Sequence, residues 1–166
     1  ALHGNLAMAQ DVRVKNLLVE HLNSPLTLNT VQPRLSWQMD DARRGAKQTA
    51  FQILAASKFD LLKEGSADLW DSGKINSNDS DLVTYKGRTL HSRDGVFWTV
   101  RIWDAAGKPS RWSKPEHFEI GLLHPEDWKA KWIGLKTASE SVETMDGVKW
   151  IWFPEGNPRE NAPQGE

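Results

Sequence analysis

The sequence predicts an all-β protein in which seven short strands form a sandwich, followed by an extended C-terminal segment. Two observations support this prediction. Runs of alternating apolar and polar residues recur through residues 12–121 at intervals of roughly ten, which is typical of two-sheet folds. Turn-forming residues such as glycine, proline, asparagine and aspartate separate these runs.

Seven runs fit the pattern, and turns or connections make up the rest of this region. Pro25 and Pro33 mark the segment between the first two runs as an edge or a connection, because proline has no N–H to donate to a sheet ladder. Ser57 is expected to cap a short helical turn that Gly65 would end. The predicted strands are residues 12–22, 34–40, 49–57, 68–75, 82–87, 96–103 and 116–121.

Alternation within each strand also predicts the core, since successive residues of a strand point to opposite faces. The alternation breaks at residues 15 and 16, where we expect an irregularity in the first strand. Phe97 and Trp103 fall on the face opposite the core, and we expect that face to be partly covered. The side chains predicted to pack in the core are Trp37, Phe51, Ile53, Trp98, Val100 and Ile102.

Segments at both ends of the chain flank the predicted sandwich of residues 11–121. Residues 1–10 are interpreted either as the remnant of a secretory signal, because residues 7–9 (AMA) have the small-x-small pattern of a cleavage site, or as a cloning-derived or disordered leader. Residues 122–147 are predicted to be a connector. Residues 148–166 contain the apolar run KWIWFP, which is typical of a strand.

Composition excludes several classes of function. The 21 basic and 22 acidic residues nearly cancel, so neither nucleic acid nor a membrane surface is expected as a partner. The chain has no cysteine, which excludes disulfides and thiolate metal sites. No stretch approaches the ~20 apolar residues that span a bilayer. The outlier is the count of nine tryptophans, a residue used both in β-sandwich cores and on sugar-binding faces.

Five stretches in a fixed order point to a family. They are NSPLTLNTVQPRLSWQM, QTAFQILAAS, LWDSGKINS, FWTVRIWDAAGKPSRWSKPEHFEIGLL and WKAKWIG, within residues 14–135. Each alone is unspecific, but together they resemble the N-terminal region of bacterial α-L-rhamnosidases, which are multidomain glycoside hydrolases. The resemblance implies a fibronectin type III-like, or immunoglobulin-like, sandwich. Trp37 and Trp98 match the aromatic positions of its second and sixth strands.

Trp98 departs from the family pattern, in which tyrosine is usual at that position. The hydroxyl group that bonds to the backbone in a tyrosine corner is therefore absent, and the indole N–H is left to find an acceptor of its own.

The resemblance also implies the role of the chain. WIWFPEGNP resembles the first strand of a jelly-roll domain that follows the sandwich, and the catalytic (α/α)6 barrel of the family has no counterpart in this sequence. We therefore predict a non-catalytic structural module, with no catalytic residue and no cofactor. Its partners would be the other domains of an inverting, exported (periplasmic or extracellular) bacterial enzyme that hydrolyses terminal α-L-rhamnose.

Two alternative functions remain open. An accessory carbohydrate-binding module would stack exposed indoles on sugar rings, whereas the same indoles in a structural module would pack against neighbouring domains. A concave patch with a bare indole flanked by Asp, Asn or Arg would favour sugar binding. The second alternative is a free-standing adhesion or receptor domain. The candidate sugar-binding residues are Trp103, Trp112, Trp128 and Trp132.

The C-terminal apolar run predicts association. An uncovered apolar strand is a template for pairing, so it should pair with the sheet edge of another chain or fold back on the sandwich. This prediction disfavours a free-standing module. The residues of this association strand are Trp150, Ile151, Trp152 and Phe153.

Acidic and histidine residues form no pattern that predicts a metal site. Asp79 and Asp81 alternate with side-chain oxygens in NSNDSD, but the spaced glycine and distal glutamate of a Ca²⁺ loop are missing. The histidines at positions 3, 21, 91, 117 and 124 include no pair at i, i+3 or i, i+4 spacing.

Overall fold

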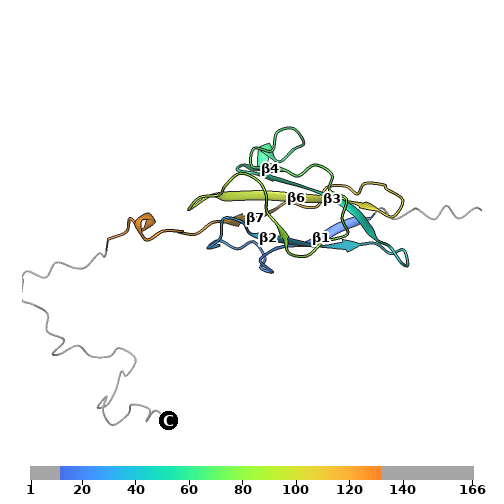
Figure 1. Cartoon of the computed structure of the whole chain (residues 1–166), viewed down its shortest axis with the longest axis horizontal. Coiled ribbons are helices and arrows are strands. Elements are labelled where there is room, and N and C mark those ends of the chain that lie inside the picture. Colours follow the sequence, from blue (N-terminus) through green and yellow to red (C-terminus); the bar gives the residue numbers. More distant parts are fainter. Residues whose placement is uncertain (1–11, 132–166) are drawn as a thin grey trace, which may run out of the picture. The chain divides into compact units, whose positions relative to one another are not determined.

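The computed structural model describes residues 12–131, which fold into an antiparallel β-sandwich (Figure 1). The predictions for the leader at residues 1–10, for Trp132 and for residues 148–166 lie outside this range. Within it, no helix is long and apolar enough to cross a membrane.

The sandwich consists of a three-stranded sheet in the order β1-β2-β5 and a four-stranded sheet in the order β4-β3-β6-β7. All neighbouring strands pair antiparallel. The predicted seven-stranded all-β sandwich is thereby confirmed. Its strands are β1 (Arg13–Val19), β2 (Arg34–Asp40), β3 (Gln48–Ala56), β4 (Trp70–Asp71), β5 (Val83–Thr84), β6 (Gly95–Asp104) and β7 (Glu116–Glu119). Two short 3₁₀ helices, η1 (Phe59–Leu61) and η2 (Pro125–Asp127), accompany the strands.

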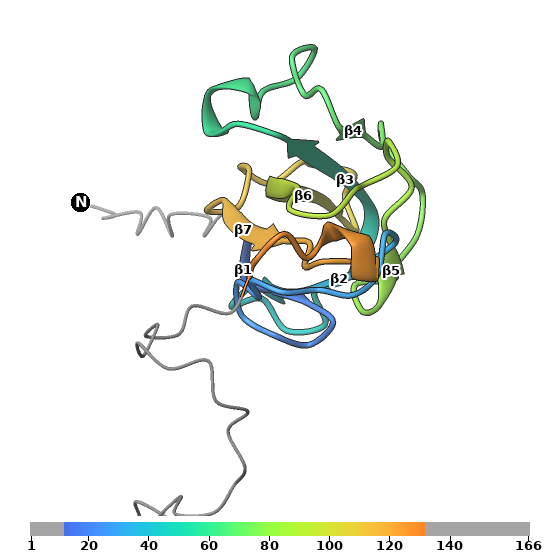
Figure 2. The ribbon, with the colours of Figure 1, turned by 90° about the vertical axis from the view of Figure 1, so that its left-hand side faces the viewer.

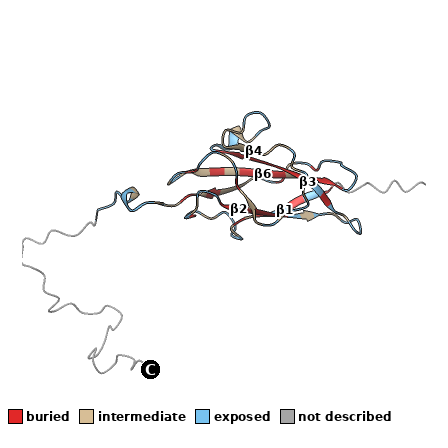
Figure 3. Cartoon of the chain, viewed as in Figure 1, coloured by how far each residue is buried: buried red, intermediate tan, exposed pale blue. Residues whose placement is uncertain are grey.

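The core lies between the two sheets, where both present buried segments (Figure 3). Strand β3 pairs with β6 along nearly its whole length, with Phe51 opposite Ile102 and Ile53 opposite Val100. Trp37 on β2 packs edge-on against Phe51, with 5.0 Å between ring centroids. Burying one such side chain contributes roughly 1.5–3 kcal/mol. The predicted core side chains Trp37, Phe51, Ile53, Trp98, Val100 and Ile102 are all at most 3% exposed.

The second face of the four-stranded sheet is also largely covered. On β6, Thr99 is buried and its hydroxyl donates to the carbonyl oxygen of Ser113 at 3.0 Å. Trp103 on the same face is 8% exposed. On β3, Leu54 and Ala56 are buried as well. A strand that is buried on both faces is typical of the centre of a sheet, and β3 and β6 hold the two central positions.

The irregularity predicted at residues 15 and 16 is a bulge in β1. The register of β1 against β2 shifts between Lys15 and Leu18. Asn16 has a φ of 51°, in the left-handed region that asparagine tolerates better than most residues. Its side-chain amide donates to the amide oxygen of Gln38 at 2.8 Å. The bulge brings Leu17 into the core.

The turn after β3 contradicts the prediction that Ser57 caps a helix. Helix η1 begins after Lys58, and no side chain caps it. The Ser57 hydroxyl instead donates to Asp68 Oδ2 at 2.6 Å, and the Ser57 backbone N–H donates to Asp68 Oδ1 at 2.9 Å. A capping serine must offer its oxygen to a backbone N–H, whereas here the carboxylate across the loop engages the serine.

Trp98 fills the core without a partner for its indole N–H, whose nitrogen has no acceptor among residues 12–131. An unpaired buried donor costs about 1–3 kcal/mol, which the burial of a large indole offsets. Tyr85 is buried as well, and its hydroxyl group donates to the carbonyl oxygen of Arg88 at 3.0 Å. A tyrosine-to-backbone bond is therefore present, at a residue that the sequence did not single out.

Gly87 packs directly against this tyrosine. A Cβ atom added at Gly87 would lie 2.4 Å from the Tyr85 hydroxyl oxygen, 2.5 Å from the carbonyl oxygen of Leu69 and 2.6 Å from Trp70 Cβ. Two of these three neighbours are backbone or Cβ atoms that cannot rotate away. Only glycine fits at this position.

We predict that Gly87→Ala lowers the free energy of unfolding by roughly 1–3 kcal/mol, because the added methyl group overpacks the site. Urea denaturation followed by tryptophan fluorescence would measure the change. Gly121→Ala is the matched control: its Cβ would lie 3.4 Å from the nearest atom, an ordinary contact. Equal stabilities of the two variants would contradict the packing argument.

Candidate functional site

Two of the tryptophans predicted to bind sugar belong to a stack of cations and indoles. The guanidinium of Arg101 lies 4.6 Å from the ring centroid of Trp112 and 5.1 Å from that of Trp103. The ammonium of Lys74 lies 4.9 Å from the Trp103 centroid. Since Trp103 is only 8% exposed, its ring offers little free surface to a sugar.

Arg101 connects this stack to the sheet. It donates to Gln52 Oε1 at 2.8 Å and forms an ion pair with Glu64. Gln52 is buried on β3, so the guanidinium satisfies an acceptor that solvent does not reach. The stack therefore covers the outer face of the four-stranded sheet. Trp128 follows η2 and is 65% exposed, and Trp132 lies outside the described residues.

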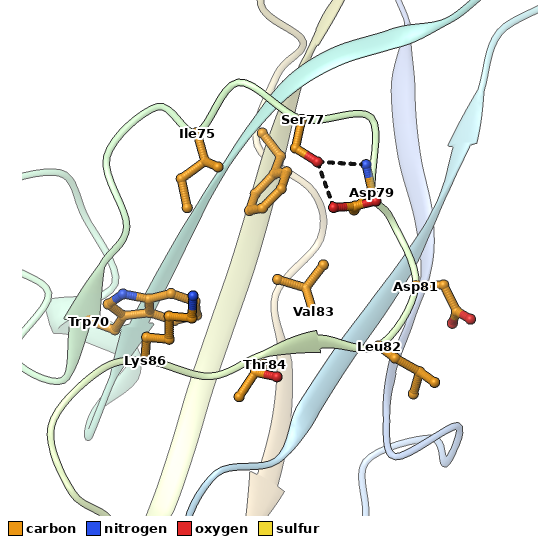
Figure 4. Close-up of a pocket in the computed structure, with 10 residues that line it drawn as sticks. Trp70, Ile75, Ser77, Asp79, Asp81, Leu82, Val83, Thr84 and Lys86 are labelled. Atoms are coloured by element: carbon orange, nitrogen blue, oxygen red, sulfur yellow. Dashed lines mark hydrogen bonds between the residues drawn. The ribbon is translucent and has the colours of Figure 1, made fainter.

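A concave patch with an indole lies elsewhere, on the side of the sandwich where β4 and β5 are the edge strands of the two sheets (Figure 2). It is a pocket of about 300 Å³. Trp70 and Lys86 lie at one end of it, and Asp81 and Leu82 at the other (Figure 4). The remaining lining residues are Phe51, Ile75, Ser77, Asp79, Val83 and Thr84.

The carboxylates at this pocket are exposed and held by serine hydroxyls. Ser77 Oγ donates to Asp79 Oδ2 at 2.8 Å. Ser36 Oγ donates to Asp81 Oδ1 at 2.7 Å and accepts the backbone N–H of Leu82 at 2.9 Å. A general acid for glycoside hydrolysis at neutral pH needs a carboxyl group in an apolar surrounding. Two solvated carboxylates are better suited to binding than to proton transfer.

Shielded carboxylates elsewhere in the described chain hold loops to strands. Asp104, at the end of β6, accepts the backbone N–H groups of Ala106 and Lys108, each at 2.9 Å. Its other oxygen accepts from Arg43 at 2.9 Å, and Arg43 also pairs with Asp41 at 2.5 Å. The Lys108 N–H and the Arg43 guanidinium lower the pKa of Asp104, and Arg43 lowers that of Asp41.

Comparison with known proteins gives the family of this sandwich. Residues 14–124 match the family model described as "Rha78A-like, N-terminal immunoglobulin domain". The chain belongs to this family. An α-L-rhamnosidase of Streptomyces avermitilis is 44% identical over 152 residues, which are 92% of this chain and 15% of that protein. An α-L-rhamnosidase of Formosa agariphila is 44% identical over 123 residues, which are 74% of this chain and 13% of that protein.

Solved structures show the same relationship. The crystal structure of the S. avermitilis α-L-rhamnosidase complexed with L-rhamnose matches with a TM-score of 0.70, over 89% of this chain and 14% of that one. The α-L-rhamnosidase from Dictyoglumus thermophilum matches with a TM-score of 0.68 at 34% identity, over 74% of this chain and 14% of that one. The immunoglobulin-like sandwich and the resemblance to α-L-rhamnosidases are confirmed, and the chain spans about 15% of the length of its relatives.

We predict that Arg101→Ala in this Rha78A-like domain lowers the free energy of unfolding by roughly 1–3 kcal/mol, because it removes two cation–π contacts and leaves Gln52 without its donor. Tryptophan emission should shift to longer wavelength as Trp112 gains solvent. Arg111→Ala is the matched control at an exposed neighbouring position, where a change within about 0.5 kcal/mol is expected. A similar loss in both variants would contradict the role of the stack.

We also predict that the domain loses stability in acid. The folded state holds the pKa of Asp104 and Asp41 below their ordinary value of 3.8. Their stabilising effect is therefore complete above about pH 4 and is lost as the pH falls through the lowered values.

Urea denaturation as a function of pH would measure this loss, and Asp104→Asn should show a shallower dependence. Asp60→Asn, an exposed position on η1, serves as the control. Identical pH profiles for the wild type and Asp104→Asn would rule out this ion pair as the cause.

Proposed function

We propose that this chain is a non-catalytic structural module of an α-L-rhamnosidase that hydrolyses terminal α-L-rhamnose with inversion. The observation that carries the proposal is how the fold uses its shielded carboxylates. The side chains of Asp41 and Asp104 are 0% and 4% exposed, and both pair with Arg43. Glu20, at 21%, pairs with Arg34. These groups stabilise the sandwich and are not available for proton transfer.

Exposed leucines beside a bridge between two connecting segments support a scaffolding role. The bridge between Leu28 and Ile120 brings the segment before β2 alongside the segment after β7. Leu26 precedes this parallel bridge and is 60% exposed, and Leu122 follows it on the other segment and is 37% exposed. We assign Leu26 and Leu122 to contact with a neighbouring domain of the enzyme, because burial of exposed apolar side chains stabilises such contacts.

The same proposal covers the rest of the chain. Residues 122–147 connect the sandwich to a second domain, which begins in residues 148–166. The apolar residues 150–153 would pair within that domain. These assignments rest on the resemblance of WIWFPEGNP to the first strand of a jelly roll.

A chimera tests the proposal. Residues 14–124 of this chain would replace the matching segment of the S. avermitilis α-L-rhamnosidase, and rhamnoside hydrolysis and Tm would be measured. We expect kcat/KM and Tm close to those of the parent, a lowered Tm when the segment is deleted, and no hydrolysis by the 166-residue chain alone. Hydrolysis by the chain alone, or an unchanged Tm after deletion, would contradict the structural role.

A paired substitution tests the assignment of these two leucines. Leu26→Ser with Leu122→Ser should lower the Tm of the chimera, because the contact with the neighbouring domain is lost. In the isolated chain the same variant should unfold within about 0.5 kcal/mol of the wild type, since both side chains are exposed. Equal effects in the chimera and the isolated chain would place both leucines outside any domain contact.

A further inference from the structure

The pocket between β4 and β5 has the lining that a neutral sugar requires. A pyranose ring has an apolar C–H face that packs on a flat aromatic ring, and hydroxyl groups around its edge that both donate and accept hydrogen bonds. Phe51, Ile75 and Val83 supply the apolar floor among the lining residues, and the half-buried indole of Trp70 lies at one end (Figure 4). This is a concave patch with an indole and aspartates, at a tryptophan that the sequence did not single out.

The rim of the pocket offers both acceptors and donors. Asp79 uses one carboxylate oxygen for the Ser77 hydroxyl, and a carboxylate can accept further bonds at its other lone pairs. Lys86 is exposed at the same end of the pocket as Trp70 (Figure 4) and has no ion pair among residues 12–131. Thr84 adds a hydroxyl group. Carboxylates and an ammonium around one apolar floor suit an uncharged polyol better than an anion.

The Trp70 indole, at one end of the pocket, is held in place by the packing of Tyr85. Tyr85 packs edge-on against Trp70, with 5.2 Å between ring centroids. The Tyr85 hydroxyl group donates a hydrogen bond to the carbonyl oxygen of Arg88. Gly87 packs so closely against Tyr85 and Trp70 that a Cβ atom at this position would clash with both residues. Trp70 itself pairs with Ala55 of β3. A wall that is ordered before a ligand arrives loses little entropy on binding.

The far end of the pocket has a strained backbone. Leu82 has a φ of 51°, a conformation that is uncommon for a bulky residue and is kept only where the surroundings impose it. The bond from its N–H to Ser36 Oγ, at 2.9 Å, fixes this conformation. Strand β5 begins at the next residue, so the strained turn fixes the positions of Asp81 and Val83, which both line the pocket.

We propose that this pocket binds a single neutral monosaccharide unit, with the apolar face of the sugar against Trp70 and its hydroxyl groups bonded to Asp79 and Lys86. Its volume of about 300 Å³ lies at the lower end of the range for small-molecule sites, roughly 300–1,000 Å³, which suits one ring. The site is independent of the structural role proposed above. Either proposal can fail while the other stands.

The test is a titration of the ¹⁵N-labelled full chain with L-rhamnose, D-glucose and D-galactose in turn, followed by NMR. At least one sugar should bind saturably with a dissociation constant on the order of 1–10 mM. The indole N–H signal of Trp70 and the amide signals of residues 75–86 should shift together. The indole signals of Trp112 and Trp128 should stay in place.

Matched variants identify the site. Lys86→Ala and Asp79→Asn change exposed rim residues and should weaken binding roughly tenfold each, through the loss of a charged hydrogen bond. Lys74→Ala is the control, because it removes a lysine from the Trp103 ring instead and should leave the affinity unchanged. Trp70→Ala should abolish the shifts, and the dispersion of the remaining signals reports whether that variant is folded.

Three results would overturn the proposal. The first is the absence of saturable shifts with all three sugars. The second is shifts confined to Trp112 or Trp128. The third is an affinity that changes in Lys74→Ala and stays the same in Lys86→Ala, which would move the site to the indole stack.

Discussion

The pairing of β3 with β6 is the constraint on which the rest of this domain depends. Their shared ladder places Ile53 opposite Val100 and Phe51 opposite Ile102, and these side chains form the floor against which β2 packs through Trp37. The outer face of the same ladder positions Gln52 beside Arg101. One pair of strands therefore organises both the core and the indole stack, which is why β3 and β6 are buried on both faces.

The pocket lined by Trp70, Asp79 and Lys86 forms where the edge strands β4 and β5 leave one side of the sandwich open. Strands β4 and β5 each have two residues, so neither can close the side between the sheets with a long ladder. Ile75 forms only an isolated bridge to Phe51 there. Ile75 and Val83, which pack against the core, are thus only partly buried on that side, and Tyr85 packs edge-on against Trp70. A sandwich with longer edge strands would have no such hollow.

Sequence patterns predicted the fold well because they report local preferences. Alternation along residues 96–103 identifies Trp98, Val100 and Ile102 as one face, and the break at residues 15 and 16 locates the bulge in β1. The same reasoning failed at Ser57, and it did not identify what covers Trp103. Asp68, 11 residues along the chain, engages the serine, while Lys74 from another segment and Arg101 from the same strand lie over the indole. Periodicity reports no such partners.

By itself the sequence determined that this chain folds as a seven-stranded sandwich related to α-L-rhamnosidases, because the order of apolar and turn-forming residues specifies strands and faces locally. Tertiary structure alone decided which tryptophan faces a pocket. Trp70, Asp79 and Lys86 come from different segments, and they meet because the edges of two sheets lie on the same side of the sandwich. The spacing of these three residues along the chain does not predict that they line one pocket. Their arrangement follows from the strand order of the two sheets and from the packing of Tyr85 against Trp70.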